Sequence, residues 1–376
     1  MNNYMNKNIL GDKICESDKI CESLSDMASN YINSLSEEID ESPSDATRTI
    51  GMSILESFSK MMNSSANEEI EQYELSELNT KNNKTEICTT KRPVKLYKNL
   101  VLSSGGIKGT GQIGAVKTLI NKGLLDFTKL EAVAGVSAGS LFGILIVLGF
   151  DIDEIWELMY RLDSSKLIKP SFLTFIEKFG LDSGKIIHNF VEEILTTKTG
   201  IKHINFRQLY EISKIHFTVV GTCLTTKEVM YYDHINSPNF KVSVAIRISI
   251  GIPIVFTPFV IGSKSYVDGA FLMDYPMELF KDKLDETIGI LISGEHPTTY
   301  KCVEEYLLSL INLFMYKYYQ QSRLEYPDNT ILVNITKTES SSNMFSFEAS
   351  SKTKIQFYQD GVNACEEFCN KRFLFE

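Results

Sequence analysis

Hydrophobic and polar positions follow two different periods along this chain from residue 96 onwards. Short apolar runs are typical of buried strands, and apolar residues three or four apart are typical of helices. The pattern predicts strands at 96–102, 216–222, 229–232, 287–293 and 331–335, and helices at 113–120, 153–162, 183–195, 303–319 and 353–371. Because strands and helices alternate, we expect an α/β body with a mainly parallel sheet.

The stretch 130–149 combines both patterns around one serine. A short apolar strand leads into a turn from Gly135 to Gly139, and an apolar helix follows. G-x-S-x-G between a strand and a helix is the nucleophile-elbow pattern, in which a tight turn exposes the serine hydroxyl. The two glycines let neighbouring backbone pass close by, and small Ala138 leaves the hydroxyl accessible. Ser137 is therefore the candidate nucleophile. The stretch is rejected as a membrane span because a glutamate, two serines and three internal glycines interrupt it.

A glycine-rich loop follows the first strand. It spans 103–109 and precedes a helix, so its free backbone amides suit a negatively charged group. A Walker A loop is excluded because no G-K-[ST] follows, and a dinucleotide fingerprint would need glycine where the chain has Ser104. One alternative is a phosphate loop. The other is an oxyanion hole, in which the Gly105 and Gly106 amides face an intermediate formed on Ser137.

The serine also needs a group that takes its proton. Asp268 ends a strand-like segment and is followed by Gly-Ala, which places its carboxyl group on a turn. In hydrolases the usual order is serine, acid, histidine, and of the five histidines His296 alone follows Asp268. A Ser–Asp–His triad is thus one hypothesis. The other is a Ser–Asp dyad, which requires a dry site that raises the pKa of Asp268 and a strong oxyanion hole.

Composition separates an acidic N-terminal part from a neutral body. Residues 1–90 carry 17 acidic and 7 basic side chains, which accounts for the formal charge of −10 on the 376 residues. We expect 1–95 to be a loosely ordered, low-complexity extension, in which residues 12–17 recur as 18–23. The body has no basic stripe of the kind that nucleic acid requires, so a nucleic-acid partner is not expected.

The remaining features argue against secretion and against a metal. No basic, then apolar, then small-residue pattern follows Met1, so we expect a cytoplasmic protein or one peripheral at membranes. The seven cysteines are odd in number and scattered, which fits reduced thiols. Cys365 and Cys369 lie one helical turn apart, but neither a histidine nor a second pair is near, so we expect buried thiols.

Four ordered blocks resemble the patatin-like phospholipases. They are the segment 100–109, the elbow around Ser137, the stretch 247–258, and 266–276 with Asp268-Gly-Ala and Met-Asp-Tyr-Pro. The resemblance implies a three-layer α/β/α fold and hydrolysis of lipid acyl esters through an acyl-serine intermediate, without metal, cofactor or histidine. It assigns Ser137 as nucleophile and Asp268 as base. Gly105 and Gly106 would be the oxyanion donors, and the supporting positions are Lys108, Gly109, Gly135, Gly139 and Gly269.

The resemblance covers about 100–280 and has two departures. Tyr275 stands where asparagine is common in the family, so we expect the turn after Asp268 to differ. Ser104 stands where the family has the first of three glycines, so we expect a reshaped loop with activity retained. The domain boundaries that we expect are an extension at 1–95, a catalytic core at 96–283 and a completion of the same domain at 284–376. The expected partner is a lipid or phospholipid substrate at a membrane surface, with no transmembrane segment. An inactive lipid-binding or scaffold protein is the alternative from another class.

Overall fold

The computed structural model describes residues 96–162, 164–294, 306, 309–310, 325–336 and 349–373. The expectations for the extension at 1–95, for His296 and for most of the helix at 303–319 fall outside these residues.

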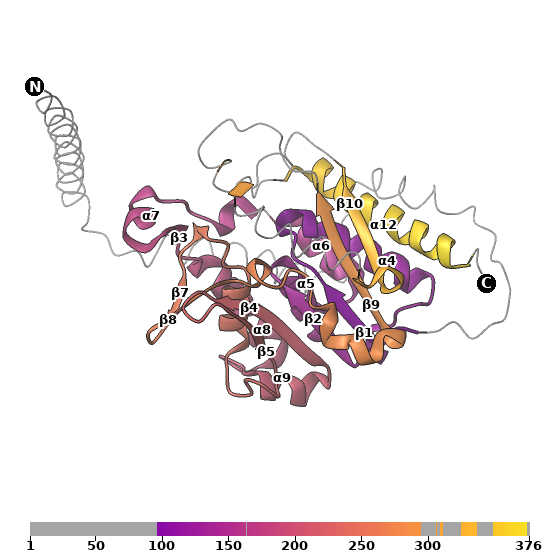
Figure 1. The fold of residues 1–376 in the computed structure, drawn as a ribbon, viewed down its shortest axis with the longest axis horizontal. Coiled ribbons are helices and arrows are strands. Elements are labelled where there is room, and N and C mark those ends of the chain that lie inside the picture. Colours follow the sequence, from indigo (N-terminus) through magenta and orange to yellow (C-terminus); the bar gives the residue numbers. More distant parts are fainter. Residues whose placement is uncertain are drawn as a thin grey trace, which may run out of the picture. The chain divides into compact units, whose positions relative to one another are not determined.

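A single large sheet organises the described residues (Figure 1). Its order is β10 (Thr330–Ile335), β9 (Thr287–Gly294), β1 (Asn99–Leu102), β2 (Ala132–Val136), β4 (His216–Cys223), β8 (Lys264–Asp268) and β7 (Phe259–Ile261), with β5 (Glu228–Tyr232) also paired to β4. The five strands from β10 to β4 are parallel. Strands β5, β7 and β8 pair antiparallel. The predicted α/β class with a mainly parallel sheet is confirmed.

Side chains that alternate along each strand separate the two faces of the sheet. On β10, the Val333 and Ile335 side chains reach Gly111 of α4 (Thr110–Asn121), whereas Leu332 packs with a cluster around Met277. Successive strand residues point to opposite faces. Helix α4 therefore covers one face, and the 3-10 segment η5 (Met277–Glu286) covers the other.

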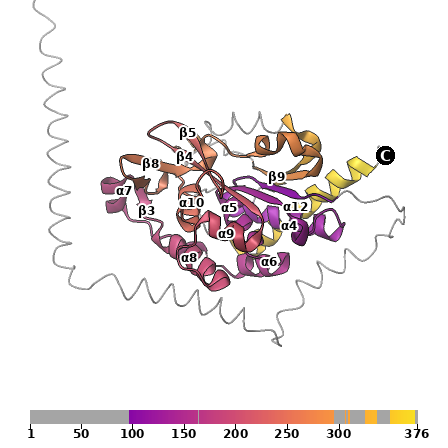
Figure 2. The same cartoon turned by 90° about the horizontal axis from the view of Figure 1, so that it is seen from below.

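The helices beside α4 continue this covering layer (Figure 2). Helix α5 (Ala138–Val147) packs against β2, and α12 (Ser351–Phe373) packs against α4 and β10. Helix α6 (Ile152–Arg161) begins with a capping box at Asp151, and its Trp156 ring lies against Tyr358 of α12. Trp156 is thus a packing residue.

Several short elements were not predicted. They are α7 (Phe172–Lys178), α9 (Phe206–Ser213), α10 (Val242–Ser249), and the parallel pair β3 (Gly180–Asp182) and β6 (Ile254–Phe256). In the chain, α7 and β3 precede α8 (Lys185–Thr199), and α9, α10 and β6 follow it. Helix α10 lies over β4 and packs against α8. Within the described part of the chain, no helix combines the length and apolarity needed to cross a bilayer.

Candidate active site

Ser137 occupies a strained turn between β2 and α5. Strand β2 ends at Val136 and α5 begins at Ala138, and the serine backbone has φ +52° and ψ −121°. A positive φ is costly for a residue other than glycine and persists only where surrounding structure enforces it. The Ser137 amide donates to Ser249 Oγ at 2.9 Å, and Ser140 Oγ donates to the Ser137 carbonyl at 2.6 Å. These two bonds fix the turn from both sides.

The elbow glycines are required because backbone segments cross closely here. A Cβ placed on Gly135 would lie 2.4 Å from the Gly139 carbonyl oxygen. A Cβ on Gly139 would lie 2.4 Å from the Leu102 carbonyl oxygen at the end of β1. Both distances are far below a van der Waals contact, so only glycine permits this crossing.

The register of the sheet brings Asp268 beside the elbow. Val136 is level with Val220 of β4, so the next residue, Ser137, reaches the level of Gly221. Gly221 is in turn paired with Asp268 at the end of β8. Side chains of residues more than 130 positions apart therefore emerge at one edge of the sheet. Gly269 allows the following turn, because a Cβ there would lie 2.4 Å from the Val220 carbonyl oxygen.

The Asp268 carboxyl group is buried and only partly paired. The residue is 3% exposed, and its Oδ1 accepts the Ala270 amide at 2.9 Å. Its Oδ2 has no partner of ordinary hydrogen-bond geometry among the described residues. Burial raises the pKa of Asp268 to about 7, although the Ala270 amide and the Ser137 hydroxyl both act to lower it. A carboxyl with a pKa near neutrality suits a general base, because it is partly ionised and still basic.

The glycine loop lies against the elbow. Gly105 precedes the 3-10 turn η1 (Gly106–Gly109), and Gly106 has φ +53°. Neither the Gly105 nor the Gly106 amide donates a backbone hydrogen bond within the described residues. A Cβ on Gly109 would lie 3.0 Å from the Ala138 side chain, so the turn packs directly on the start of α5.

Lys108 sits half-buried in the same turn. It forms no ion pair with any described residue, and burial lowers its pKa. The site thus contains one cation that is held without a carboxylate partner in the described chain.

Ser104 ties the glycine loop to the segment after Asp268. Ser104 Oγ donates to Asp274 Oδ1, and the Ser104 amide donates to the Asp274 carbonyl at 3.2 Å. Burial raises the pKa of Asp274 to about 6, against the lowering effect of the Ser104 bonds. Neither this link nor the Ser249 contact is predictable from a local sequence pattern, since each joins residues more than 100 positions apart.

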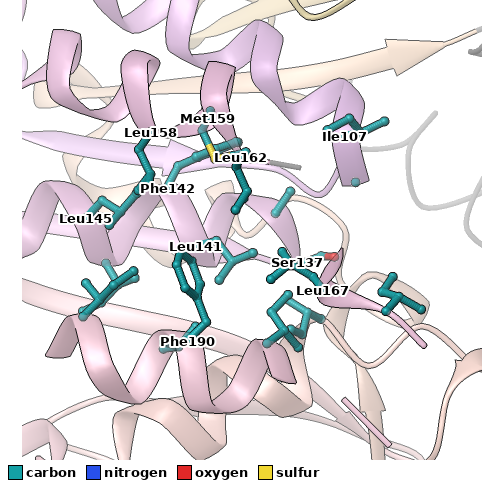
Figure 3. Close-up of a pocket in the computed structure, with 18 of the residues that line it drawn as sticks. Ile107, Ser137, Leu141, Phe142, Leu145, Leu158, Met159, Leu162, Leu167 and Phe190 are labelled. Atoms are coloured by element: carbon teal, nitrogen blue, oxygen red, sulfur yellow. The ribbon is translucent and has the colours of Figure 1, made fainter. Parts of the chain in front are cut away.

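An apolar pocket opens at Ser137 (Figure 3). It holds about 1010 Å³ of free space, including its open mouth. Gly106, Ser137 and Ala138 line it together, and the rest of the lining is aliphatic, aromatic or, at Met159, a thioether. Ser137 and Leu167 lie toward one end, and Leu145 and Leu158 toward the other. The lining comes mainly from α5, α6 and α8, whose apolar faces meet there.

No metal site accompanies these groups in the described residues, where no cluster of three histidine, cysteine or acidic side chains has suitable geometry. Cys365 and Cys369 are buried thiols. His296 lies outside the described residues, so its position relative to Asp268 is not part of this geometry.

The fold and the site define an α/β protein with a nucleophile elbow, an adjacent buried carboxyl group and an apolar pocket. The model of the family Patatin-like phospholipase matches residues 100–281. This part of the chain is a patatin-like phospholipase domain.

Similar proteins occur in viruses and bacteria. The chain is 28% identical over 283 residues to "Uncharacterized protein R571" of Acanthamoeba polyphaga mimivirus, covering 72% of this chain and 93% of that protein. It is 29% identical over 214 residues to "Uncharacterized protein YqhO" of Bacillus subtilis, covering 53% of this chain and 72% of that protein. It is 25% identical over 188 residues to "Probable lipid hydrolase 463L" of Invertebrate iridescent virus 6, covering 49% of this chain and 63% of that protein.

Two solved structures are similar at low sequence identity. VipD from Legionella pneumophila has a TM-score of 0.49 at 16% identity, covering 76% of this chain and 72% of that chain. The type III effector protein ExoU has a TM-score of 0.41 at 14% identity, covering 74% and 53%, so this chain spans about half of it.

Proposed function

We propose that this chain is a lipid acyl hydrolase of phospholipase A type that uses Ser137 and Asp268 as a catalytic dyad. The observation that carries the proposal is the interaction of the Ser137 hydroxyl with the buried Asp268 carboxyl, at a pocket that Ser137 lines together with Gly106, whose amide donates no backbone hydrogen bond among the described residues. The match of residues 100–281 to the patatin-like family and the similarity to a probable lipid hydrolase of an iridescent virus support lipid as the substrate class.

In the first half of the reaction, Ser137 Oγ attacks the carbonyl carbon of the ester and its proton passes to Asp268 Oδ2. The Gly105 and Gly106 amides donate hydrogen bonds to the resulting oxyanion, and each donor lowers the activation barrier by about 3 kcal/mol. When the tetrahedral intermediate collapses, the C–O bond to the alcohol breaks and Asp268 returns the proton to the leaving oxygen. The products of this half are the acyl-serine and a lysolipid.

In the second half, water attacks the acyl-serine while Asp268 takes a proton from it. Collapse of the second intermediate releases the fatty acid and restores the Ser137 hydroxyl. The pocket walls hold the acyl chain, because the transfer of a hydrocarbon tail from water to an apolar cavity lowers the free energy. Its wall carries almost no polar groups beyond the site itself.

We further propose that the catalytic core at 96–283 and residues 284–376 form one domain, preceded by the extension at 1–95. Strands β9 and β10 belong to the second range, yet β9 pairs with β1 of the core along four residues. Helix α12 packs on α4. The core alone would leave β1 as an open sheet edge, so we expect it not to fold without 284–376.

The test is release of fatty acid from a panel of phospholipid vesicles and triacylglycerol emulsions. The wild-type chain should release fatty acid, and Ser137→Ala and Asp268→Ala should each abolish release while leaving the circular-dichroism spectrum unchanged. Ser183→Ala, at an exposed serine outside the pocket, is the matched control. Full activity in either site variant refutes the dyad. Loss of activity in His296→Ala to the same extent as Ser137→Ala supports the triad instead.

A further inference from the structure

Helix α7 exposes an unusual amount of apolar surface for so short an element. Phe172 is 71% exposed, Ile176 is 59% exposed, and Phe179, which caps the helix, is 73% exposed. Phe172 and Ile176 are four residues apart and so share one face of the helix. Large apolar side chains are normally buried, and a contiguous exposed group marks a surface that binds something.

A second apolar group lies at the same end of the molecule. Val260 is 62% exposed and Ile261 is 38% exposed, both on β7. The chain runs from α7 into β3, β3 pairs with β6, and β6 leads within three residues to β7. Figures 1 and 2 both place α7, β3 and β8 together at one end of the described residues. We call the group Phe172, Ile176, Phe179, Val260 and Ile261 the apolar end.

The apolar end adjoins the pocket mouth. Leu167 and Ile168 line the pocket and lie just before Ser171, the residue that caps α7. Ile252, two residues before β6, and Phe256, the last residue of β6, also line it, and β7 begins three residues after Phe256. The two segments that carry the exposed side chains therefore supply part of the pocket wall. Leu167 lies toward the Ser137 end of this wall in Figure 3.

Charge around the apolar end is opposite in sign to that of the whole chain. Lys169, Lys178 and Lys264 are exposed on the same segments, and Glu177 is the exposed acid among them. The full chain carries a net charge of −10. A cluster of aromatic and aliphatic side chains rimmed by lysines is suited to the interface of a bilayer that contains anionic lipid.

We propose that the apolar end is a docking surface for an anionic phospholipid membrane. Phe172, Ile176 and Phe179 enter the boundary between headgroups and acyl chains, and the surrounding lysines contact lipid phosphates. This docking places the pocket mouth at the membrane, where an acyl chain passes into the pocket without crossing water. Only this last consequence rests on the proposed hydrolase function.

The experiment compares membrane binding with intrinsic activity. Co-sedimentation is measured with vesicles of phosphatidylcholine and of phosphatidylcholine mixed with phosphatidylserine, and activity with a soluble short-chain ester. The test variant is Phe172→Ser, Ile176→Ser and Phe179→Ser combined. The matched control is Ile212→Ser, Leu224→Ser and Ile235→Ser, at apolar residues that are 53%, 45% and 66% exposed and lie outside α7 and β7.

The wild-type chain should bind the mixed vesicles more tightly than phosphatidylcholine alone. The test variant should lose at least about tenfold in vesicle affinity and keep its activity on the soluble ester, because burial of three large apolar groups is removed without change to the site. The control should keep both. Absence of vesicle binding by the wild-type chain overturns the proposal, as does equal loss in test and control variants.

A second variant, which changes charge and leaves the apolar side chains in place, tests the proposal if the first variant also loses its activity on the soluble ester. Lys169→Glu, Lys178→Glu and Lys264→Glu combined should remove the preference for phosphatidylserine, and a retained preference overturns the proposal. Concentration-dependent light scattering that the test variant abolishes would show a contact between two copies of the chain and also overturn it. Vesicle binding without hydrolysis of vesicles or soluble ester leaves the docking surface standing and refutes the proposed function.

Discussion

Asp268→Asn should abolish catalysis and at the same time stabilise the fold above neutral pH. An amide cannot accept the serine proton, and a general base contributes about 10²–10⁴-fold in rate. The amide oxygen can still accept the Ala270 amide, and the side chain keeps its volume. The substitution removes the free-energy cost of ionising a buried carboxyl group.

The size of the stabilisation follows from the pKa. Burial raises the pKa of Asp268 to about 7 from 3.8. Since one decade in the proton equilibrium is about 1.36 kcal/mol, ionisation of this group in the folded chain costs on the order of 4 kcal/mol. The folded chain binds the proton more tightly than the unfolded chain. The wild-type free energy of unfolding therefore loses this contribution as pH rises from about 4 to about 7, and the variant does not lose it.

The assay is urea denaturation at about pH 4 and about pH 8, followed by fluorescence of Trp156, the one tryptophan of the chain. The variant should match the wild type at the lower pH and exceed it at the higher pH. Asp233→Asn is the control of opposite sign. Burial raises the pKa of Asp233, but hydrogen bonds from His216, Asn236 and the Ile235 amide outweigh this and hold it at about 2. The ionised Asp233 therefore stabilises the folded chain at all pH values above about 4, and Asp233→Asn should lower the free energy of unfolding at both pH values of the assay. A variant at Asp268 that is less stable than wild type at both pH values refutes the reasoning.

Three further predictions concern the same site. Cleavage of a soluble ester should decline as pH falls below about 7, because protonated Asp268 cannot act as base; a flat profile of kcat/KM against pH contradicts this. Gly139→Ala should lower the free energy of unfolding by about 1–3 kcal/mol or more in urea titrations, because its Cβ would lie 2.4 Å from the Leu102 carbonyl oxygen. Leu145→Trp should shift released fatty acids toward shorter chains in a competition assay, since it fills the pocket end away from Ser137; an unchanged product distribution would exclude that end as the acyl site.

The strands and the elbow were predictable because they carry strong local patterns. Strands β1, β9 and β10 each contain a short apolar run, and the turn at Ser137 needs glycines at fixed offsets. Helices α4, α6, α8 and α12 show apolar residues at helical spacing. By contrast, α7 has only seven residues and β3 and β6 have three each, so none of them is long enough to establish a period.

The geometry of the site depends on contacts that no local pattern encodes. Asp268 reaches Ser137 through the register of two strand pairs, and the Ser104 bond to Asp274 spans 170 positions. Ser249 supports the elbow from α10, a helix that the sequence pattern does not predict. The pocket lies between the apolar faces of α5, α6 and α8. The sequence predicts each of these helices separately, but it does not show how they pack against one another.

The most direct test of the central claim is covalent labelling with a fluorophosphonate, followed by mass spectrometry of the digested chain. The expected result is one adduct, on Ser137, which forms faster as pH rises through about 7 and slows sharply in Asp268→Asn. Labelling that persists in Ser137→Ala, or that proceeds at the wild-type rate in Asp268→Asn, would show that these two side chains do not act together.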